Sequence, residues 1–558
     1  MKKNQNKKKR KKIFWIIIIL IIISFAIFKI FKKDIKIVEK EIYINENGEE
    51  VVGKIKDKKG WLDKLNPEQG EDKPKDIDGL YNKPKSTFTD LFSSTARIDE
   101  EKTSLRFDWN GKVISFPLKV EFKQFDLDFF NHFSPKISQI SNDYPKSILL
   151  IGKNTKEHIN QAILWKPELL YKDNSKENSL KVQKFEKINL KDIGISNIND
   201  ILKISFYDNN YLLFIKNNKG INIKVLNNKL SLKNEKEIDI DDSNLKISCS
   251  KNSCLLYDSG ENIVTNLNLK DLKLSKIDSL SEKLQNISPE QVEFSFNEVL
   301  NSWIIASLKT QQFKLWQFKN GEVKTILKQA SKYPGTLNLK CFENGKTFLL
   351  WASYYSRGYL VDKNLEVNDL SERLGFRASK DFPVLIKENN GLIYLLREDK
   401  ILLRFDGDVI QRMDEDFWHY RKAKFSNIFF NKDLKSQGII LTYNDDEGMR
   451  VYKFFDQGFD LSAIRTIVSK KFNSSATSKI LGAQIIEVEK KSNNSAFRYF
   501  LSNNNGKDWQ EVEVGQAIKF KNRGNNLIWK AKIAPYKKAN AFKPPYLNTI
   551  HLQYWYQR

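Results

Sequence analysis

Residues that bind metals or carry redox chemistry are scarce in this sequence. Its 558 residues include 3 Cys, 3 Met and 4 His. The histidines are scattered, at His132, His158, His419 and His551, without the His-x-x-x-His or His-Glu-x-x-His spacing of zinc sites. Neither the Gly-x-Ser-x-Gly elbow of serine hydrolases nor the Gly-x-Gly-x-x-Gly turn of dinucleotide-binding proteins occurs. We therefore predict no catalytic, metal-binding or cofactor-binding residue.

Proline and glycine are also few. The chain has 13 Pro and 24 Gly, which excludes a collagen-like or proline-rich fibre. Hydrophobic residues make up 40% and aromatic residues 12% of the chain. That is enough to build a large core, so wholesale disorder is excluded as well. At about 150 residues per domain, the length predicts three to four domains.

Positive charge exceeds negative charge by +25. Residues 1–12 hold eight cations and no acid, and residues 29–85 add a net charge of one. The remaining +16 is dispersed, mostly as Lys among Asn and Ile. A nucleic-acid surface would need Lys and Arg clustered on one face or helix, so we predict no nucleic-acid partner. The dispersed charge either reflects composition or holds the protein against an anionic envelope polymer.

The one long apolar run lies at the N-terminus. Residues 13–28 contain no charged side chain, and the run reaches residue 31 if Lys29 snorkels, which is just long enough to span a bilayer. We predict a transmembrane signal-anchor helix at 13–31, with residues 1–12 as a cytoplasmic basic tail and an extracytoplasmic body. The alternative is a signal peptide cleaved after Ala26, although the apolar stretch continues beyond that residue.

A spacer follows the predicted helix. Residues 53–87 hold three prolines, four glycines and a dense mixture of both charge signs. Such a segment buries too little apolar surface to offset the entropy of ordering it. We predict that residues 32–95 form an extracytoplasmic spacer, with a small hairpin around Asn47-Gly48 within residues 36–52.

Beyond the spacer, a pattern of short strands and turns recurs. The starts of the units are 42 to 47 residues apart, and an earlier unit lies at residues 147–165. Each unit opens with two strands, in most units joined by an Asn-rich or Asn-Gly turn. A period of about 40 to 50 residues with about four strands is typical of a β-propeller blade. The units begin near Ile201, Lys246, Glu293, Asn338, Pro383 and Phe425.

The repeat predicts a β-propeller over residues 96–470. We count seven blades, while six or eight stay open because the hairpin at residues 105–116 either closes the ring or belongs to another element. The sequence resembles the broad class of divergent β-propellers. It has no Trp-Asp dipeptide and no Gly-Gly pair, so the WD and kelch families are not indicated. A series of β-sandwiches or a solenoid is the alternative arrangement.

The strand spacing changes near the C-terminus. Six strand-like runs lie close together in residues 478–558, which predicts a small β-sandwich. This segment is similar to carbohydrate-associated or surface β-sandwich modules that follow repeat domains.

One turn in the predicted sandwich has a recognisable pattern. Ser502, Asn504, Gly506 and Trp509 resemble the Asp-box hairpin of sialidase-type propellers, Ser-x-Asp-x-Gly-x-Thr-Trp, with Asn504 in place of the Asp and Asp508 in place of the Thr. The local logic is structural, because Asn504 can bond turn amides and Gly506 can adopt the left-handed conformation. In that family the box lies away from the catalytic centre.

Two of the three cysteines flank the tip of a predicted hairpin. Cys249 and Cys254 are placed to meet across its two strands, and they would form a disulfide in an oxidising compartment. Two free thiols fit the sequence equally well. Cys341 is left over and is predicted to be a small buried apolar residue.

In fold class, the sequence predicts an all-β protein with an N-terminal transmembrane helix, a β-propeller and a C-terminal β-sandwich. We predict a membrane-anchored extracytoplasmic module that binds or scaffolds envelope proteins or surface polymers such as glycans. One alternative is a structural subunit of an envelope assembly. The other is a sialidase-type glycoside hydrolase, in which arginines would converge with a carboxylate. The candidate arginines are Arg357, Arg377, Arg397, Arg404, Arg412 and Arg421.

Overall fold

The computed structural model describes most of the chain after residue 84 and a short hairpin before it. The described residues are 40–44, 50–54, 83, 85–90, 97–109, 113–125, 132–140, 147–165, 185–217, 220–240, 245–309, 312–330, 335–352, 356–374, 383–397, 401–413, 425–430, 437–444, 448–471, 479–493, 495–535 and 540–557.

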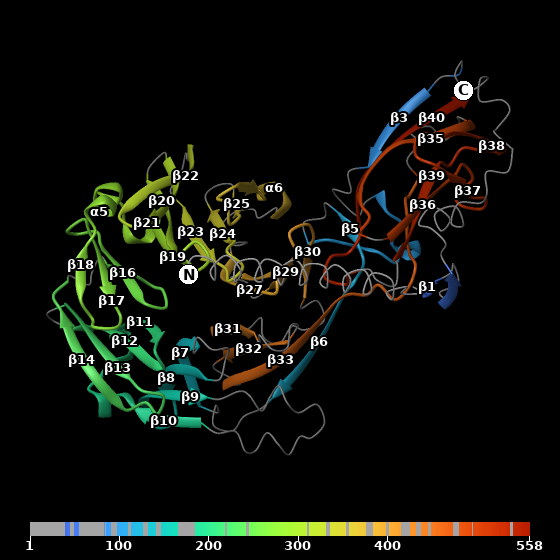
Figure 1. Cartoon of the computed structure of the whole chain (residues 1–558). Coiled ribbons are helices and arrows are strands. Elements are labelled where there is room, and N and C mark those ends of the chain that lie inside the picture. The colour runs from blue at the N-terminus through green and yellow to red at the C-terminus, as the bar shows by residue number, and fades with distance from the viewer. Residues whose placement is uncertain are drawn as a thin grey trace, which may run out of the picture.

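Within the described residues, seven four-stranded antiparallel sheets follow one another around a ring (Figure 1). This arrangement confirms the predicted propeller. Blade 1 contains β7 (Phe133–Ile140), β8 (Ile148–Asn154), β9 (Ile159–Trp165) and β10 (Phe185–Asn189). Blade 2 contains β11 (Ile201–Tyr207), β12 (Asn210–Asn217), β13 (Gly220–Leu226) and β14 (Leu232–Ile238). Blade 3 contains β15 (Leu245–Cys249), β16 (Ser253–Asp258), β17 (Ile263–Asn268) and β18 (Leu274–Lys276).

Blades 4 to 6 continue in the same order, with the first strand of each blade innermost. They are β19 (Val292–Asn297), β20 (Ser302–Lys309), β21 (Gln312–Lys319) and β22 (Glu322–Ala330); β23 (Thr336–Cys341), β24 (Thr347–Ala352), β25 (Ser356–Val361) and β26 (Val367–Asp369); and β27 (Pro383–Asn389), β28 (Leu392–Arg397), β29 (Leu402–Phe405) and β30 (Ile410–Arg412). The short helices that join the strands are α5 (Asp278–Leu284), α6 (Ser371–Leu374), η5 (Leu190–Ile193), η6 (Ile198–Asp200) and η7 (Pro289–Gln291).

A strand from the far end of the chain closes the ring. Blade 7 consists of β31 (Phe425–Phe430), β32 (Gln437–Asn444), β33 (Gly448–Phe459) and, as its outermost strand, β6 (Leu118–Phe125). The register runs from Val451 opposite Phe125 to Phe459 opposite Leu118. The closing strand therefore lies directly after the hairpin at residues 105–116. That hairpin does not close the ring, because its strands pair within the sheet of the C-terminal body.

The blades are held together by apolar side chains on both faces of their strands. The first seven residues of β20 are all buried, because a blade packs against a neighbour on each side and a strand inside it has no solvent face. Between blades 4 and 5, for example, the Phe313 ring stacks on Trp351 with centroids 5.0 Å apart. This explains the apolar runs that mark the repeat in the sequence.

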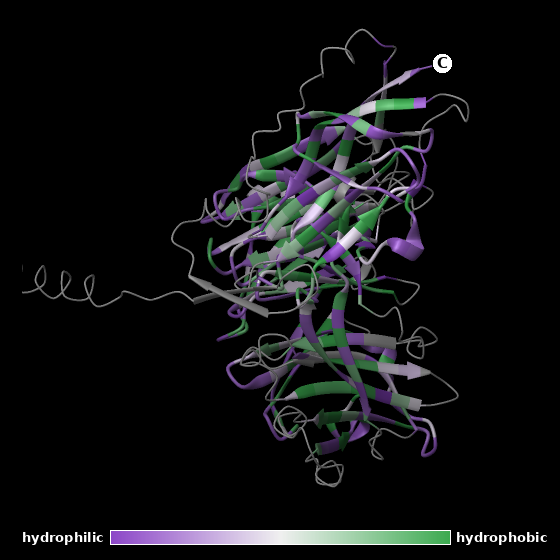
Figure 2. Ribbon diagram, turned by 90° about the vertical axis from the view of Figure 1, so that its right-hand side faces the viewer, coloured by the Kyte–Doolittle hydropathy of each residue, from purple (hydrophilic) through white to green (hydrophobic). Residues whose placement is uncertain are grey.

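The C-terminal body is a sandwich of two sheets. One contains β38 (Ala517–Gly524), β35 (Lys479–Lys491), β40 (Tyr546–Gln557), β5 (Ile114–Ser115) and β4 (Arg106–Phe107), with β3 (Lys85–Asp90) paired to β40. The other contains β34 (Arg465–Val468), β39 (Ile528–Pro535), β36 (Ser495–Ser502) and β37 (Gln510–Val512). The helix η2 (Glu100–Lys102) precedes β4. Buried residues from both ends of the chain, such as Phe116 and Trp529, share one core, and Figure 2 shows hydrophobic residues along these strands.

The strand pairing corrects the predicted boundaries. The sandwich was expected to occupy residues 478–558 and the propeller residues 96–470, with residues 32–95 as spacer. In the structure β3, β4 and β5 pair within the sandwich sheet that contains β40, and β34 pairs with β39. Local strand patterns do not specify partners hundreds of residues away, which is why these strands were assigned to neighbouring elements. The propeller is thus an insertion within the sandwich.

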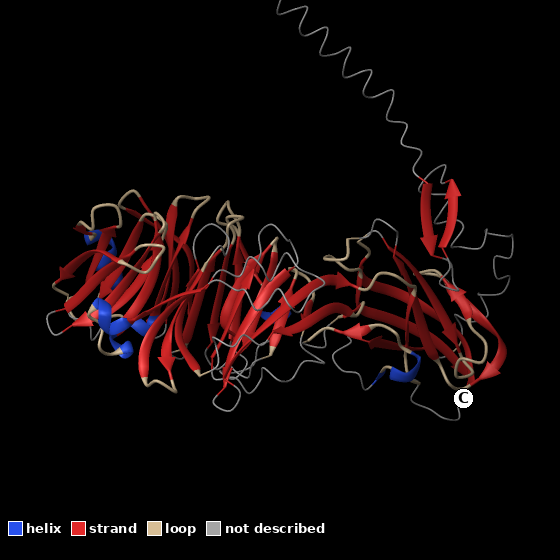
Figure 3. Cartoon of the chain, turned by 90° about the horizontal axis from the view of Figure 1, so that it is seen from below, coloured by secondary structure: helices blue, strands red, loops and turns tan. Residues whose placement is uncertain are grey.

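Two strands connect the bodies, which adjoin in Figure 3. The paired strands β6 and β33 both continue toward the sandwich (Figure 1). The amide of Asp460 donates to the carbonyl of Pro117 at 2.9 Å, and that of Phe459 donates to Ala541 at 2.7 Å. The same contacts therefore close the ring and attach it to the sandwich.

The predicted hairpin near the N-terminus is confirmed. Strands β1 (Lys40–Ile44) and β2 (Glu50–Lys54) pair antiparallel, with Ile44 opposite Glu50. In the described part of the chain, no helix has the length and apolar character needed to cross a membrane. The predicted helix at 13–31 and the basic tail at 1–12 lie outside the described residues, so both stay predictions.

Candidate functional site

The innermost strands carry a repeated tripeptide. Lys-Ile-Ser begins at Lys136 in β7, at Lys203 in β11 and at Lys246 in β15, and Glu293-Phe294-Ser295 replaces it in β19. Because alternate residues of a strand point to the same face, the first and third residues share a face while the middle one points away. Ile204, a middle residue, is 2% exposed within the core between blades 1 and 2.

The serines of this repeat join neighbouring blades. The hydroxyl of Ser248 donates to the carbonyl of Phe294 in the next blade at 2.9 Å. Ser295 in turn accepts a hydrogen bond from the amide of Cys341, one blade further, at 2.8 Å. These bonds hold three innermost strands side by side, and so they position the charged residues that the strands carry.

Four lysines from four innermost strands form what we call the axial lysine cluster: Lys203, Lys246, Lys340 and Lys387. The ammonium group of Lys246 lies 2.5 Å from a carboxylate oxygen of Glu293. In the described part of the chain, the other three lysines have no carboxylate within ion-pair distance. Within the described residues, these three lysines thus share the inner side of the ring without an ion-pair partner.

Burial lowers the pKa values of Lys203, Lys340 and Lys387, and the charges of neighbouring lysines lower those of Lys203 and Lys387 further. Loss of hydration lowers the pKa of Lys387 to about 7, and the charges of Lys340 and Lys203 add to the effect. Burial is also the main cause that lowers the pKa of Lys203 and of Lys340, and Lys340 acts on Lys203 as well. The lysines that repel one another come from the innermost strands of blades 2, 5 and 6, so the repulsion acts between different parts of the ring.

Solvent reaches the cluster even though protein surrounds it. The side chains of Lys203 and Lys340 are exposed and that of Lys387 is partly buried. Next to Lys340, the thiol of Cys341 is partly buried and lies 3.3 Å from the hydroxyl of Thr347, and burial raises its pKa. Cys341 is therefore in a more polar setting than the predicted apolar one.

Lys136, the lysine of the repeated tripeptide in blade 1, does not belong to the cluster. The ammonium group of Lys136 donates to the carbonyl of Ile198 at 3.1 Å and to the side chain of Asn199 at 2.9 Å. These oxygens satisfy it at the edge of the neighbouring blade, so it is not counted among the cluster cations.

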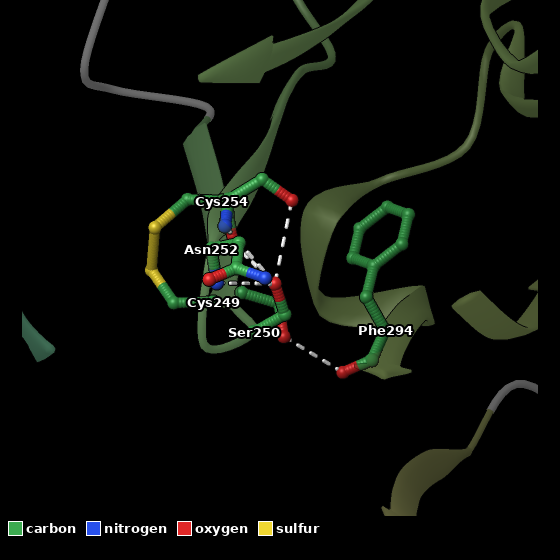
Figure 4. Close-up of a disulfide and its surroundings, with 7 residues drawn as sticks. Cys249, Ser250, Asn252, Cys254 and Phe294 are labelled. Atoms are coloured by element: carbon green, nitrogen blue, oxygen red, sulfur yellow. Dashed lines mark hydrogen bonds between the residues drawn. A yellow bond between two sulfur atoms is a disulfide. The ribbon is translucent and has the colours of Figure 1, made fainter. Parts of the chain in front are cut away.

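A disulfide joins Cys249 and Cys254, one of the two states that the sequence left open (Figure 4). The two residues are directly paired in β15 and β16. The turn between them is closed by the amide of Ser250, which donates to the carbonyl of Ser253 at 2.7 Å. Lys246 lies three residues before Cys249 on the same strand, so the disulfide constrains a strand that carries a cluster lysine.

The Asp-box-like turn makes contacts within its own hairpin. The side-chain oxygen of Asn504 accepts from the hydroxyl of Ser502 at 2.8 Å and from the amide of Asp508 at 2.9 Å. Gly506 has φ +81°, and a Cβ there would lie 3.1 Å from the ring of Trp509. These contacts explain the residue types at the four positions in terms of local structure, and the likeness to the Asp box stays a resemblance.

The arginines required by the hydrolase alternative lie elsewhere. Arg404 is buried in an ion pair with Asp456, the Arg397 guanidinium lies over the Trp109 ring, and Arg357 is an exposed residue of β25. Arg412 ends β30. Arg377 and Arg421 lie outside the described residues. The described residues of the seven innermost strands include lysines but no arginine, so this part of the chain does not assemble that site.

The sequence contained a signal for the cluster that composition concealed. Lys246, Glu293, Lys340 and Lys387 follow one another at intervals of 47 residues, which is the blade period. Lys is so frequent in this chain that a charged position recurring with the blade period does not stand out from the general bias toward Lys.

Comparison with known proteins gives a fold likeness and no family. No family model and no curated protein matches the chain. The WD40 domain of Toxoplasma gondii coronin is 9% identical over 63% of this chain and 92% of that chain, with a TM-score of 0.36. The Dos1 propeller is 10% identical over 67% of this chain and 94% of that chain, with a TM-score of 0.34. The chain is a divergent β-propeller repeat protein, and that assignment rests on its own strand pairing.

Proposed function

We propose that this protein is a membrane-anchored extracytoplasmic binding module that takes an anionic group of an envelope protein or surface polymer at the axis of its propeller. The axial lysine cluster carries this proposal. It brings four lysines and one glutamate to the inner side of one ring. Clusters of like charge with lowered pKa values are costly to fold and are typical of functional sites.

Two further observations support the extracytoplasmic location. The apolar run at residues 13–31 follows eight cations, which is the charge pattern of a helix with a cytoplasmic N-terminus. The Cys249–Cys254 disulfide suits an oxidising compartment, since cytosolic thiols are kept reduced. Protease added to intact cells that express the full chain should therefore digest the body, and complete protection of the body would refute this topology.

Cross-linking in the native envelope tests the binding role. Wild-type protein should capture an anionic polymer or protein that is lost when Lys203, Lys246, Lys340 and Lys387 are all changed to Gln. The matched control removes the same charge from four exposed lysines, Lys229, Lys233, Lys346 and Lys363, and should capture as the wild type does. Equal capture by the two variants would refute binding at the ring axis.

A further inference from the structure

We infer that the group bound by the axial lysine cluster is a compact phosphate, either a phosphate monoester or a pyrophosphate. This inference rests on the proposed function, and it names the chemistry of the ligand at the same site. It is argued from the charge, the arrangement and the side-chain types of the cluster.

Charge balance favours an anion with more than one negative charge. The pair Lys246 and Glu293 is neutral as a unit, which leaves Lys203, Lys340 and Lys387 with a combined charge of up to +3 when all are protonated. A single carboxylate would offset one of these charges. A phosphate monoester carries a charge of about −1.5 to −2 at neutral pH, and a pyrophosphate carries more, so either removes most of the repulsion among the three lysines.

The direction of approach also favours phosphate. Lys203, Lys340 and Lys387 lie on the innermost strands of blades 2, 5 and 6, so their side chains start from different sides of the ring. A tetrahedral phosphate presents oxygens in several directions to such point charges. Flat carboxylates are matched instead by the planar fork of arginine, and the described innermost strands have no arginine.

Two hydroxyl groups on the innermost strands take part in bonds between blades. Ser248 donates to the carbonyl of Phe294, and Ser295 accepts from the amide of Cys341. These serines hold the strands in place, so the lysines supply the recognition. Recognition by charge alone predicts strong salt dependence and preference for the more highly charged of two similar ions.

Proton uptake should accompany binding. The pKa of Lys387 in the free protein is about 7, lowered by burial and then by Lys340 and Lys203. On its own strand, Glu388 is the neighbouring acid, at a position that points to the opposite face, while Glu293 and Lys246 face the cluster from blades 4 and 3. A bound phosphate favours the charged form of Lys387 and raises its pKa. The affinity should therefore fall as the pH rises from about 6.5 to 8.5.

Calorimetric titration of the purified full-length protein tests the inference, with inorganic pyrophosphate as the probe and citrate as a carboxylate of similar charge. We expect pyrophosphate to bind at least tenfold more tightly than citrate. Binding should weaken at least tenfold in Lys387→Gln and in Lys340→Gln, and it should be unchanged in the exposed control Lys229→Gln. Heats measured in buffers of different ionisation enthalpy should show proton uptake at pH 7 to 8. Thermal melting of each variant shows whether it is folded.

Phosphorylated and unmodified dextran form a second arm, which separates a free ion from a group carried by a polymer. Binding of the phosphorylated polymer, in competition with pyrophosphate, supports a polymer-borne phosphate, and binding of pyrophosphate alone supports a free ion. Equal affinity for citrate and pyrophosphate overturns the inference. So does failure of both phosphate probes to bind. If capture in the envelope still depends on the cluster in either case, the proposed function stands while the ligand chemistry is wrong.

Discussion

Two regions of this protein surround charged groups with protein, and they do so in opposite ways. At the junction with the sandwich, Arg404 and Asp456 are both 0% exposed and form an ion pair of 2.8 Å. The hydroxyl of Tyr394 donates to the same carboxylate at 2.8 Å, and the amide of Gly458 donates to its other oxygen at 2.8 Å. At the ring axis, Lys203, Lys340 and Lys387 have like charge and lack such partners in the described residues.

The difference separates a structural role from the binding role that we propose. A buried charge that is paired and hydrogen-bonded adds little net stability, but it fixes one arrangement of the elements that supply its partners. At the junction, the pair of Arg404 and Asp456 fixes blade 6 against blade 7. The centroid of the Phe459 ring lies 4.9 Å from the Arg404 guanidinium carbon. Burial, followed by the charge of Asp456, also raises the pKa of Tyr394 well above its usual value, so the phenol stays a donor. Like charges held together cost stability, and under the proposed function a bound anion offsets that cost.

The largest expected effect is at the junction. Asp456→Asn removes the ion-pair partner of buried Arg404, and loss of one partner of such a pair costs about 3–5 kcal/mol. Urea unfolding should show this decrease, with the exposed Asp239→Asn as the control. The double variant Arg404→Met with Asp456→Leu should lose less, because it leaves no charge unpaired. A decrease below about 1 kcal/mol for Asp456→Asn would mean that water reaches the pair and that the two regions do not differ as described.

Replacing a lysine at the axis should stabilise the fold, whereas Asp456→Asn destabilises it. Unfolded lysine has a pKa near 10.4 and folded Lys387 one of about 7, so between these values the unfolded chain binds more protons. Stability of the wild type should therefore rise with pH from 7 to about 10.4 and be lowest below pH 7. Lys387→Met removes this term and should stabilise the fold at pH 7 by about 2–3 kcal/mol, a reduced figure because solvent screens the axis.

The pH profile is the decisive measurement for this variant. The difference in the free energy of unfolding between Lys387→Met and the wild type should become smaller as the pH rises and vanish above about pH 10.4. The same substitution at exposed Lys346 should change nothing. If Lys387→Met destabilises the protein at every pH, the lysine has an unrecognised structural partner and the contrast with Arg404 fails.

The disulfide gives the axial side a covalent constraint beside its unfavourable charges. Reduction of Cys249–Cys254 frees a short loop, and the chain-entropy model gives about 2 kcal/mol for a loop of this size. Urea unfolding of the wild type with and without reductant measures the loss. In Cys249→Ala with Cys254→Ala, reductant should have no further effect, while Cys341→Ala should still respond as the wild type does. An unchanged unfolding midpoint in the reduced wild type would contradict a stabilising bond.

The sequence predicts the blades well because each blade is local. Neighbouring strands are joined by short turns, and positions such as Asn209 and Asn390, with φ +59° and +53°, show the backbone conformation that Asn tolerates. The first strands of blades 2 to 7 begin at or within two residues of the predicted starts. Local pattern and local pairing thus give the same answer for this part of the fold.

Ring closure and the axial cluster could not be predicted in this way. The strand β6 is largely solvent-accessible, and its partner β33 begins more than 300 residues later, so its pairing is decided by the geometry of the closed ring. Lys203, Lys340 and Lys387 are also far apart in the chain. Their convergence follows from ring closure, because only then do blades 2, 5 and 6 share an axis.

The smallest expected effect tests whether the axial lysines are held in place. Ser248→Ala removes the hydrogen bond to the carbonyl of Phe294, which should cost about 1 kcal/mol. Ser279→Ala removes a solvent-exposed bond to the carbonyl of Gly321 and should cost less. Because this bond joins the strands of Lys246 and Glu293, hydrogen exchange should rise at the amides of β15 and β19 and remain unchanged in blade 6. Pyrophosphate affinity should fall by only a few-fold, since Lys340 and Lys387 are untouched. A uniform rise in exchange over all blades would show that the serine supports the whole ring rather than the spacing of the cluster.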